Sequence, residues 1–273
     1  MVAEDVAFAR LVLALDPYLR ELVFIGGWAH RLFVLHEAVS PIPFTPLMTI
    51  DADIASPPHM KGATSIDDLL RGAGFLPEYL GDQRPPVTHY HFAAGPGSFY
   101  AEFLVNRSGG QREDRANDTV TVAGVVAQRL RYIDLLLARP WTVHLQEAKG
   151  FPVGATGLAI RICNPASFIA QKLLIFDDRK PGDQAKDLLY IHDTVLMVAR
   201  SLPAIRELWV DVQAVLHPKQ RRRVEQARCD LFGAVGDRIR GAADIARHTG
   251  RPSPPSPEQI RQVCSAALAE IFS

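Results

Sequence analysis

Two aspartates, Asp51 and Asp53, stand one residue apart in the segment 47–54 (LMTIDADI), which has the composition of a β-strand. Side chains at positions i and i+2 of a strand point to the same face, so the spacing predicts two carboxylates held side by side. Neighbouring carboxylates repel each other and resist burial. A divalent cation removes that conflict, because Mg²⁺ favours a few carboxylate oxygens together with water and substrate phosphates. The pair therefore predicts a site for a metal ion and a nucleotide.

Two further features extend this predicted site. Gly26 and Gly27 stand between a short apolar segment and a segment of helical character. A strand, a diglycine turn and a helix in this order let the backbone come close to a phosphate group. Glu102 lies within the β-like segment 98–105, on a strand that is otherwise largely apolar. This placement makes Glu102 a third candidate metal ligand.

The elements that position these residues follow from apolar periodicity and from Gly and Pro punctuation. Predicted strands cover residues 22–25, 47–54, 75–80, 87–93, 98–105, 141–145 and 158–163. Predicted helices cover residues 3–15, 28–38, 65–71, 127–137, 203–216, 220–239 and 258–272, with two more around the polar turn 177–184. The fold class is therefore α+β. We predict a catalytic domain over residues 1–163, with a mixed sheet and flanking helices, and a helical domain over residues 164–273.

Composition narrows the class of protein. The chain has 273 residues, of which 48% are hydrophobic and 22% charged, and its formal net charge is zero, as in ordinary globular proteins. Cys163, Cys229 and Cys264 are too few and too widely spaced for a disulfide framework or a C-x-x-C metal clip. The N-terminus lacks the pattern of a signal peptide, and the chain holds no apolar run of membrane-spanning length. We expect a cytoplasmic protein without a membrane segment.

The order of these motifs resembles the polymerase-beta-like minimal nucleotidyltransferases, particularly the bacterial group of abortive-infection and toxin-antitoxin nucleotidyltransferases. The resemblance covers residues 20–195 by pattern and order. Its matching features are Gly26-Gly27, the T-x-D-x-D run 49–53, Glu102, and the helical segment 165–193 with Lys172 and Asp187. The diglycine is a weak signal by itself, whereas the ordered combination is fairly specific.

This resemblance implies the transfer of NMP from an NTP, such as ATP, to an acceptor hydroxyl. Asp51 and Asp53 would hold Mg²⁺, with Mn²⁺ as the alternative ion, at the β- and γ-phosphates. One of the two aspartates and Glu102 would hold a second ion at the α-phosphate. Lys172 would neutralise phosphate charge, and Asp187 would orient Lys172 or the substrate. The acceptor would be a tRNA, a protein or a small molecule, and an antitoxin partner would accompany a toxin.

Several alternatives remain open at this stage. A non-catalytic nucleotide-binding or partner-binding module would retain the fold, and Trp28 favours it because many relatives carry a hydroxyl residue beside the diglycine. His89 and His91 form an H-x-H pair on a strand, which a metal hydrolase could use. Glu102 could instead pair with a structural arginine such as Arg161.

The two binding candidates in the helical part also have a structural alternative. Lys172 and Asp187 could form an ion pair between helices or point into solvent. The residue types are the same in each case, so the sequence leaves the choice open.

Overall fold

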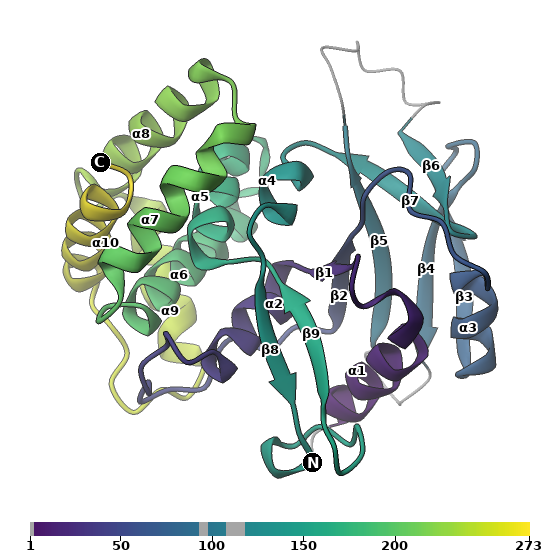
Figure 1. The fold of residues 1–273 in the computed structure, drawn as a ribbon. Helices are drawn as coiled ribbons and strands as arrows, with labels where there is room; N and C mark the ends of the chain where they lie inside the picture. Colours follow the sequence, from purple (N-terminus) through teal and green to yellow (C-terminus); the bar gives the residue numbers. More distant parts are fainter. Residues whose placement is uncertain (1–2, 93–97, 108–117) are drawn as a thin grey trace. The chain divides into compact units, whose positions relative to one another are not determined.

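The computed structural model describes residues 3–92, 98–107 and 118–273, and the chain forms two compact units (Figure 1). The first unit comprises Met1–Ala29 and Met48–Cys163. The second comprises His30–Leu47 and Asn164–Ser273, so a segment from the first part of the chain groups with the C-terminal helices. The end of the predicted strand 87–93 and most of the polar loop 106–118 lie outside the described residues.

A mixed sheet forms the first unit, and its described residues make nine strands. The strands are β1 Val23–Phe24, β2 Asp51–Ala55, β3 Phe75–Leu80, β4 Val87–Phe92, β5 Tyr100–Asn106, β6 Thr119–Val122, β7 Val125–Leu130, β8 Trp141–Leu145 and β9 Leu158–Ile162. Their order is β3-β4-β5-β2-β1-β9-β8, with β7 paired to β5 and β6 to β7. The pairs β2–β5, β5–β7 and β1–β9 are parallel, and the others are antiparallel. The predicted α+β class with a mixed sheet is confirmed.

The two faces of the central strands differ in burial. Ala52 and Ile54 of β2 are fully buried, whereas Asp51 and Asp53 on the opposite face are only partly covered. β5 repeats this alternation over its first four residues, Tyr100 to Phe103. The period of two in β2 thus produces an apolar face and a polar face, as the spacing of the aspartates predicts.

Helices α1 (Ala3–Ala14) and α3 (Ile66–Gly72) contribute side chains to the apolar side of this sheet. Phe8 of α1 stacks on Trp28 at 3.9 Å between ring centroids and meets the ring of Phe24 edge-on at 5.2 Å. The hydroxyl of the buried Tyr90 in β4 donates to Asp67 of α3 at 2.8 Å. These contacts leave the polar face to the acids.

The predicted helix 127–137 is wrong in its first half. Residues 125–130 form β7, which pairs with both β5 and β6, and α4 covers only Ile133–Leu137. A tight turn at Ala123 and Gly124, both with positive φ, reverses the chain between β6 and β7. Pairing with β5 thus overrides the local helical pattern.

Six longer helices form most of the second unit: α5 Pro165–Ile175, α6 Pro181–Met197, α7 Leu202–Val212, α8 Pro218–Phe232, α9 Asp237–His248 and α10 Pro257–Ile271. The predicted single helix 220–239 is wrong, because α8 ends at Phe232 and α9 begins at Asp237. Gly233 and Gly236 flank this break, and glycine weakens a helix interior. Asn164 caps α5 by accepting a hydrogen bond from the Ser167 backbone N–H.

Helix α2 (Gly26–Leu32) follows β1 directly, so the predicted order of strand, diglycine and helix is present. Among the described residues, no helix is both long and apolar enough to cross a membrane.

Candidate active site

The carboxylates on the polar face of the sheet lie in neighbouring strands. In the parallel pairing of β2 with β5, Asp53 stands directly opposite Glu102 (Figure 1 shows the two strands side by side). In the antiparallel pairing of β5 with β4, Glu102 stands directly opposite His89. The structure thus places three predicted ligands together, because Asp51 lies two residues before Asp53 on the same face. We call Asp51, Asp53 and Glu102 the acid cluster.

Gly26 is the point where the diglycine meets the acid cluster. The φ of Gly26 is +63°, in the left-handed region that favours glycine. A Cβ atom at this position would clash with the carboxylate of Asp53. The backbone N–H of Ile25 also donates to the carbonyl oxygen of Asp53 at 2.9 Å. The close approach of the turn to Asp53 therefore requires glycine at residue 26, and Gly27 follows it within α2.

Glu102 lies between a histidine and an acid. His89 Nε2 is 3.2 Å from Glu102 Oε2, and both side chains are about one-fifth exposed. Burial acts to raise the pKa of Glu102, but hydrogen bonds with His89 and Asp53 outweigh burial and lower the pKa overall. A hydrogen bond between two carboxyl groups needs a shared proton. When that proton is absent, both carboxylates are ionised and repel each other, so a cation that takes its place is favoured.

Asp51 and Tyr100 stand opposite each other at the end of the same face. The Thr49 hydroxyl donates to Asp51 Oδ1. Burial, together with the charges of Asp51, Glu102 and Asp53, raises the pKa of Tyr100 well above its usual value. The phenol is therefore protonated at neutral pH and adds no further negative charge to the cluster.

The acid cluster fits a divalent cation in its chemistry. Carboxylate oxygens are the ligands that Mg²⁺ and Mn²⁺ favour, and a cation would offset the negative charge of the Asp53–Glu102 pair. Within the described part of the chain, however, no group of three His, Cys, Asp or Glu side chains is already arranged around one ion position. A bound cation would require these side chains to turn toward one position, while Thr49 bonds one oxygen of Asp51 and His89 lies beside one oxygen of Glu102.

His89 and His91, which form the H-x-H pair, contact two different acids. His89 contacts Glu102, whereas His91 Nε2 lies 2.6 Å from Glu78 Oε2 and its Nδ1 lies 3.3 Å from Ser98 Oγ. The two imidazole rings are 6.2 Å apart. Each histidine therefore has its own partner, which gives the metal hydrolase alternative no support.

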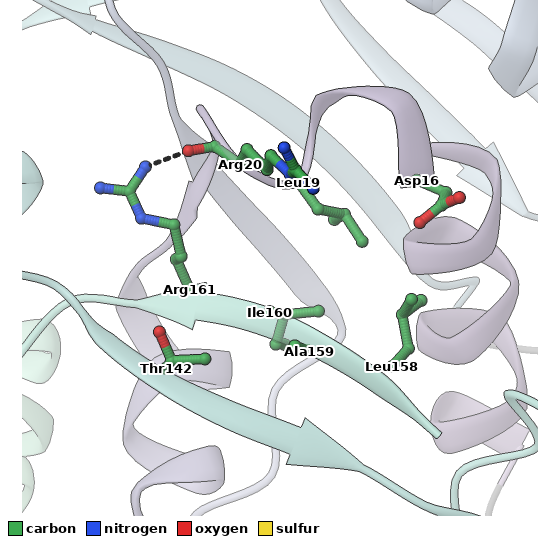
Figure 2. Close-up of a pocket in the computed structure, with 8 residues that line it drawn as sticks. All are labelled: Asp16, Leu19, Arg20, Thr142, Leu158, Ala159, Ile160 and Arg161. Atoms are coloured by element: carbon green, nitrogen blue, oxygen red, sulfur yellow. Dashed lines mark hydrogen bonds between the residues drawn. The ribbon is translucent and has the colours of Figure 1, made fainter. Parts of the chain in front are cut away.

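The predicted alternative pairing of Glu102 with Arg161 is wrong. Arg161 belongs to β9, and its Nη1 donates to the backbone carbonyl of Arg20 at 2.5 Å (Figure 2). A cavity of about 360 Å³ beside it is lined by Asp16, Leu19, Arg20, Thr142, Leu158, Ala159, Ile160 and Arg161. None of the predicted site residues lines this cavity, so the acid cluster and the cavity are separate features of the first unit.

Lys172 and Asp187 form a buried ion pair within the helical unit, with 2.5 Å between Nζ and Oδ1. Arg179 Nε lies 3.3 Å from the other oxygen of Asp187. The ammonium group of Lys172 also lies 4.8 Å from the ring of Phe168 and 4.7 Å from that of Tyr190. These contacts are those of a structural ion pair, and a role in nucleotide binding stays a prediction.

Trp28, the residue that favours the non-catalytic alternative in the sequence, is a core residue. Its ring is fully buried and stacked on Phe8. The residue after the diglycine therefore supports the first unit from within, and its identity says little about the binding of a phosphate.

His89 is a neighbour of the acid cluster that the sequence motifs do not reveal. The sequence shows His89 and Glu102 on consecutive β-like segments, but only the strand register places them opposite each other. A meander of antiparallel strands was the available signal, since such strands often pair in chain order.

A family model described as Nucleotidyltransferase matches residues 5–213. The chain belongs to this family. The matched span of the nucleotidyltransferase includes the diglycine, the acid cluster, Lys172 and Asp187. Family membership supports nucleotidyl transfer as its general activity.

Among solved structures, the chain is similar to MenT4, a nucleotidyltransferase toxin from Mycobacterium tuberculosis H37Rv. The two sequences are 17% identical, the match covers 99% of this chain and 92% of MenT4, and the TM-score is 0.39. A likeness at this level carries no argument about substrate or partner. A comparison with curated proteins found no match.

Proposed function

We propose that this nucleotidyltransferase moves NMP from an NTP to an acceptor hydroxyl, and that the acid cluster is its catalytic centre. The observation that carries the proposal is the position of Asp53. It lies opposite Glu102 on the neighbouring strand and close to the diglycine turn at Gly26. Acids and a close backbone turn are the two parts that a metal-bound triphosphate needs. Family membership supports the reaction class.

Asp51, Asp53 and Glu102 would hold Mg²⁺ or Mn²⁺. When bound, two such ions stabilise the charge that develops on the phosphates as pyrophosphate leaves. The contribution of Glu102 is also direct, because an ionised carboxylate near the α-phosphate can accept the proton of the attacking hydroxyl. Gly26 and Gly27 would let the turn lie close to the phosphates.

Lys172 and Asp187 enter the proposal as nucleotide-binding residues on the strength of the sequence pattern. A lysine ammonium neutralises phosphate charge as a point charge. In this role Asp187, which holds the ammonium at 2.5 Å, would orient it. A Lys172→Met variant should raise the KM for the NTP, and because it leaves Asp187 with Arg179 as its remaining cation, its free energy of unfolding is measured beside its KM.

The acceptor in this proposal is an RNA, a protein or a small molecule with a free hydroxyl. A toxin of this kind would be paired with an antitoxin that blocks transfer. The labelled product of a transfer assay reveals the acceptor.

The assay measures transfer from each α-labelled NTP, with Mg²⁺ or Mn²⁺, to a mixture of tRNA, proteins and small hydroxyl compounds. We expect transfer and pyrophosphate release with the wild type and their loss in the Asp51→Asn/Asp53→Asn double variant. Asp68→Asn is the matched control, because Asp68 is an exposed aspartate on α3. Equal transfer by the double variant would reject the proposed centre. Nucleotide binding without pyrophosphate release would favour the non-catalytic alternative.

A further inference from the structure

We propose that His89 is a positioning residue for catalysis, which fixes the carboxylate of Glu102 within the acid cluster. The inference rests on the proposed function, and it assigns a role to a residue outside the predicted ligand set. His89 would act through Glu102 and would not itself touch the nucleotide.

The strand register places His89 and Asp53 on opposite sides of Glu102. Glu102 is directly opposite Asp53 in one pairing and directly opposite His89 in the other. The 3.2 Å distance between His89 Nε2 and Glu102 Oε2 is that of a hydrogen bond. Glu102 therefore has an acid on one side and an imidazole on the other.

The imidazole of His89 is itself held in place. The ring of Tyr100 stacks on it with 4.6 Å between centroids and 11° between planes. Tyr100 lies two residues before Glu102 on the same face of β5. One strand thus provides both the carboxylate and the ring that fixes the orientation of its partner.

His91 provides a comparison on the same strand. It is also partly exposed and also lies near Tyr100, at 5.3 Å between ring centroids. Its imidazole, however, contacts Glu78 of β3 at 2.6 Å and not the acid cluster. The two histidines therefore differ in which acid they hold.

The physical consequence concerns the rotation of the Glu102 carboxylate. A hydrogen bond to Oε2 fixes the plane of the group and leaves lone pairs for a cation or for the acceptor proton. Without it, the carboxylate would keep only its hydrogen bond with Asp53, which is lost when both acids are ionised and repel each other. Partners of this kind typically change metal affinity or activity by about 10–100-fold.

The experiment compares His89→Phe, His89→Gln and His91→Phe in the transfer assay, with Mn²⁺ affinity measured separately by titration. Phenylalanine keeps a ring for stacking and loses the hydrogen bond, whereas glutamine can still donate to Glu102. We expect His89→Phe to lower kcat by about 10–100-fold with little change in the KM for the NTP, and to weaken Mn²⁺ binding. His89→Gln should recover most of the loss, and His91→Phe should resemble the wild type.

Several outcomes would overturn this inference. Equal losses in His89→Phe and His91→Phe would show a general effect on the sheet, and a change in KM alone would place His89 in substrate binding. If Asp53→Asn loses transfer but His89→Phe transfers like the wild type, the proposed function stands and the role of His89 is rejected. If the wild type transfers nothing, the proposed function fails, and Mn²⁺ affinity alone decides whether His89 positions Glu102. Mn²⁺ binding unchanged in His89→Phe, or absent from the wild type, rejects the inference.

Discussion

The acid cluster of the sheet and the ion pairs of the helical unit differ in whether their acids have a cation partner within the chain. In the helical unit, Asp193 receives two hydrogen bonds from the guanidinium of Arg251, at 2.7 and 2.5 Å, and both side chains are almost fully buried. On the sheet, Asp53 faces another acid, Glu102, and the group stays partly exposed. The helical unit pairs its buried acids, Asp187 and Asp193, with cations, whereas the sheet places acids together.

Under the proposed function, this difference separates charges that serve the fold from charges that would bind a ligand. A buried acid with its own cation is compensated within the chain, so the loss of either partner leaves an uncompensated charge. Two ionised acids that face each other destabilise the folded state until a proton or a cation lies between them. Substitutions in the two regions should therefore have opposite effects on stability and activity.

The largest expected effect on stability is that of Arg251→Ala. It leaves Asp193 buried without its cation, and it removes the guanidinium that lies 4.3 Å from the ring of Phe44. We expect the free energy of unfolding to fall by about 3–5 kcal/mol. Denaturant unfolding checks this, with Arg240→Ala as the control because its pair with Asp237 is exposed. Equal, small losses in both variants would remove the contrast with the sheet.

Asp53→Asn should show the reverse behaviour. It removes one negative charge beside Glu102, so we expect the free energy of unfolding to stay the same or to rise. Transfer should fall by more than about 100-fold, since even residues behind the ligands change activity by about 10–100-fold. Rate measurements and thermal unfolding of the same preparation test both halves. An unstable variant would show that Asp53 serves the fold.

Gly26→Ala should disturb the acid cluster through the backbone. The φ of +63° costs a residue with a side chain about 1–2 kcal/mol, and the added Cβ would displace the carboxylate of Asp53. We expect that loss in unfolding free energy and a fall in transfer of about tenfold or more. Gly72→Ala is the control, because a Cβ there meets nothing within 4 Å. Normal transfer by Gly26→Ala would argue against the contact with Asp53.

His30 in the helical unit makes a smaller, pH-dependent contribution. Burial, opposed by Asp193 and assisted by Lys172 and Arg251, lowers the pKa of His30 to about 3. Below about pH 6.5, His30 is protonated in the unfolded chain but stays neutral in the folded chain. The free energy of unfolding therefore falls as the pH falls. The slope approaches about 1.4 kcal/mol per pH unit. Denaturant unfolding between pH 7 and 4.5 should give a shallower slope for His30→Leu, and an equal slope would reject the assignment.

Local patterns in the sequence predicted those parts of the fold that local chemistry decides. Strands 75–80 and 141–145 match β3 and β8, because alternation and turn residues bound them clearly. The segment 125–130 was different, since its strand state depends on pairing with β5 and β6. The break between α8 and α9 could have been predicted from Gly233 and Gly236.

The candidate site also has parts that local spacing predicts and parts that depend on strand pairing. The spacing of Asp51 and Asp53 is local, so their shared face could be predicted from the sequence. The position of Glu102 opposite Asp53 and the partnership of Glu102 with His89 depend on register across three strands, which spacing along the chain does not contain. The contact of Gly26 with Asp53 likewise joins residues far apart in the chain, one at the start of α2 and one in β2.

The most direct test of the central claim is the titration of Mn²⁺ into the wild type and into Asp53→Asn at neutral pH, with folding of both confirmed. If the acid cluster is held together to receive a cation, the wild type should bind Mn²⁺ and Asp53→Asn should bind it at least about tenfold more weakly. Equal affinity in the two proteins, or no binding by the wild type, would contradict the account.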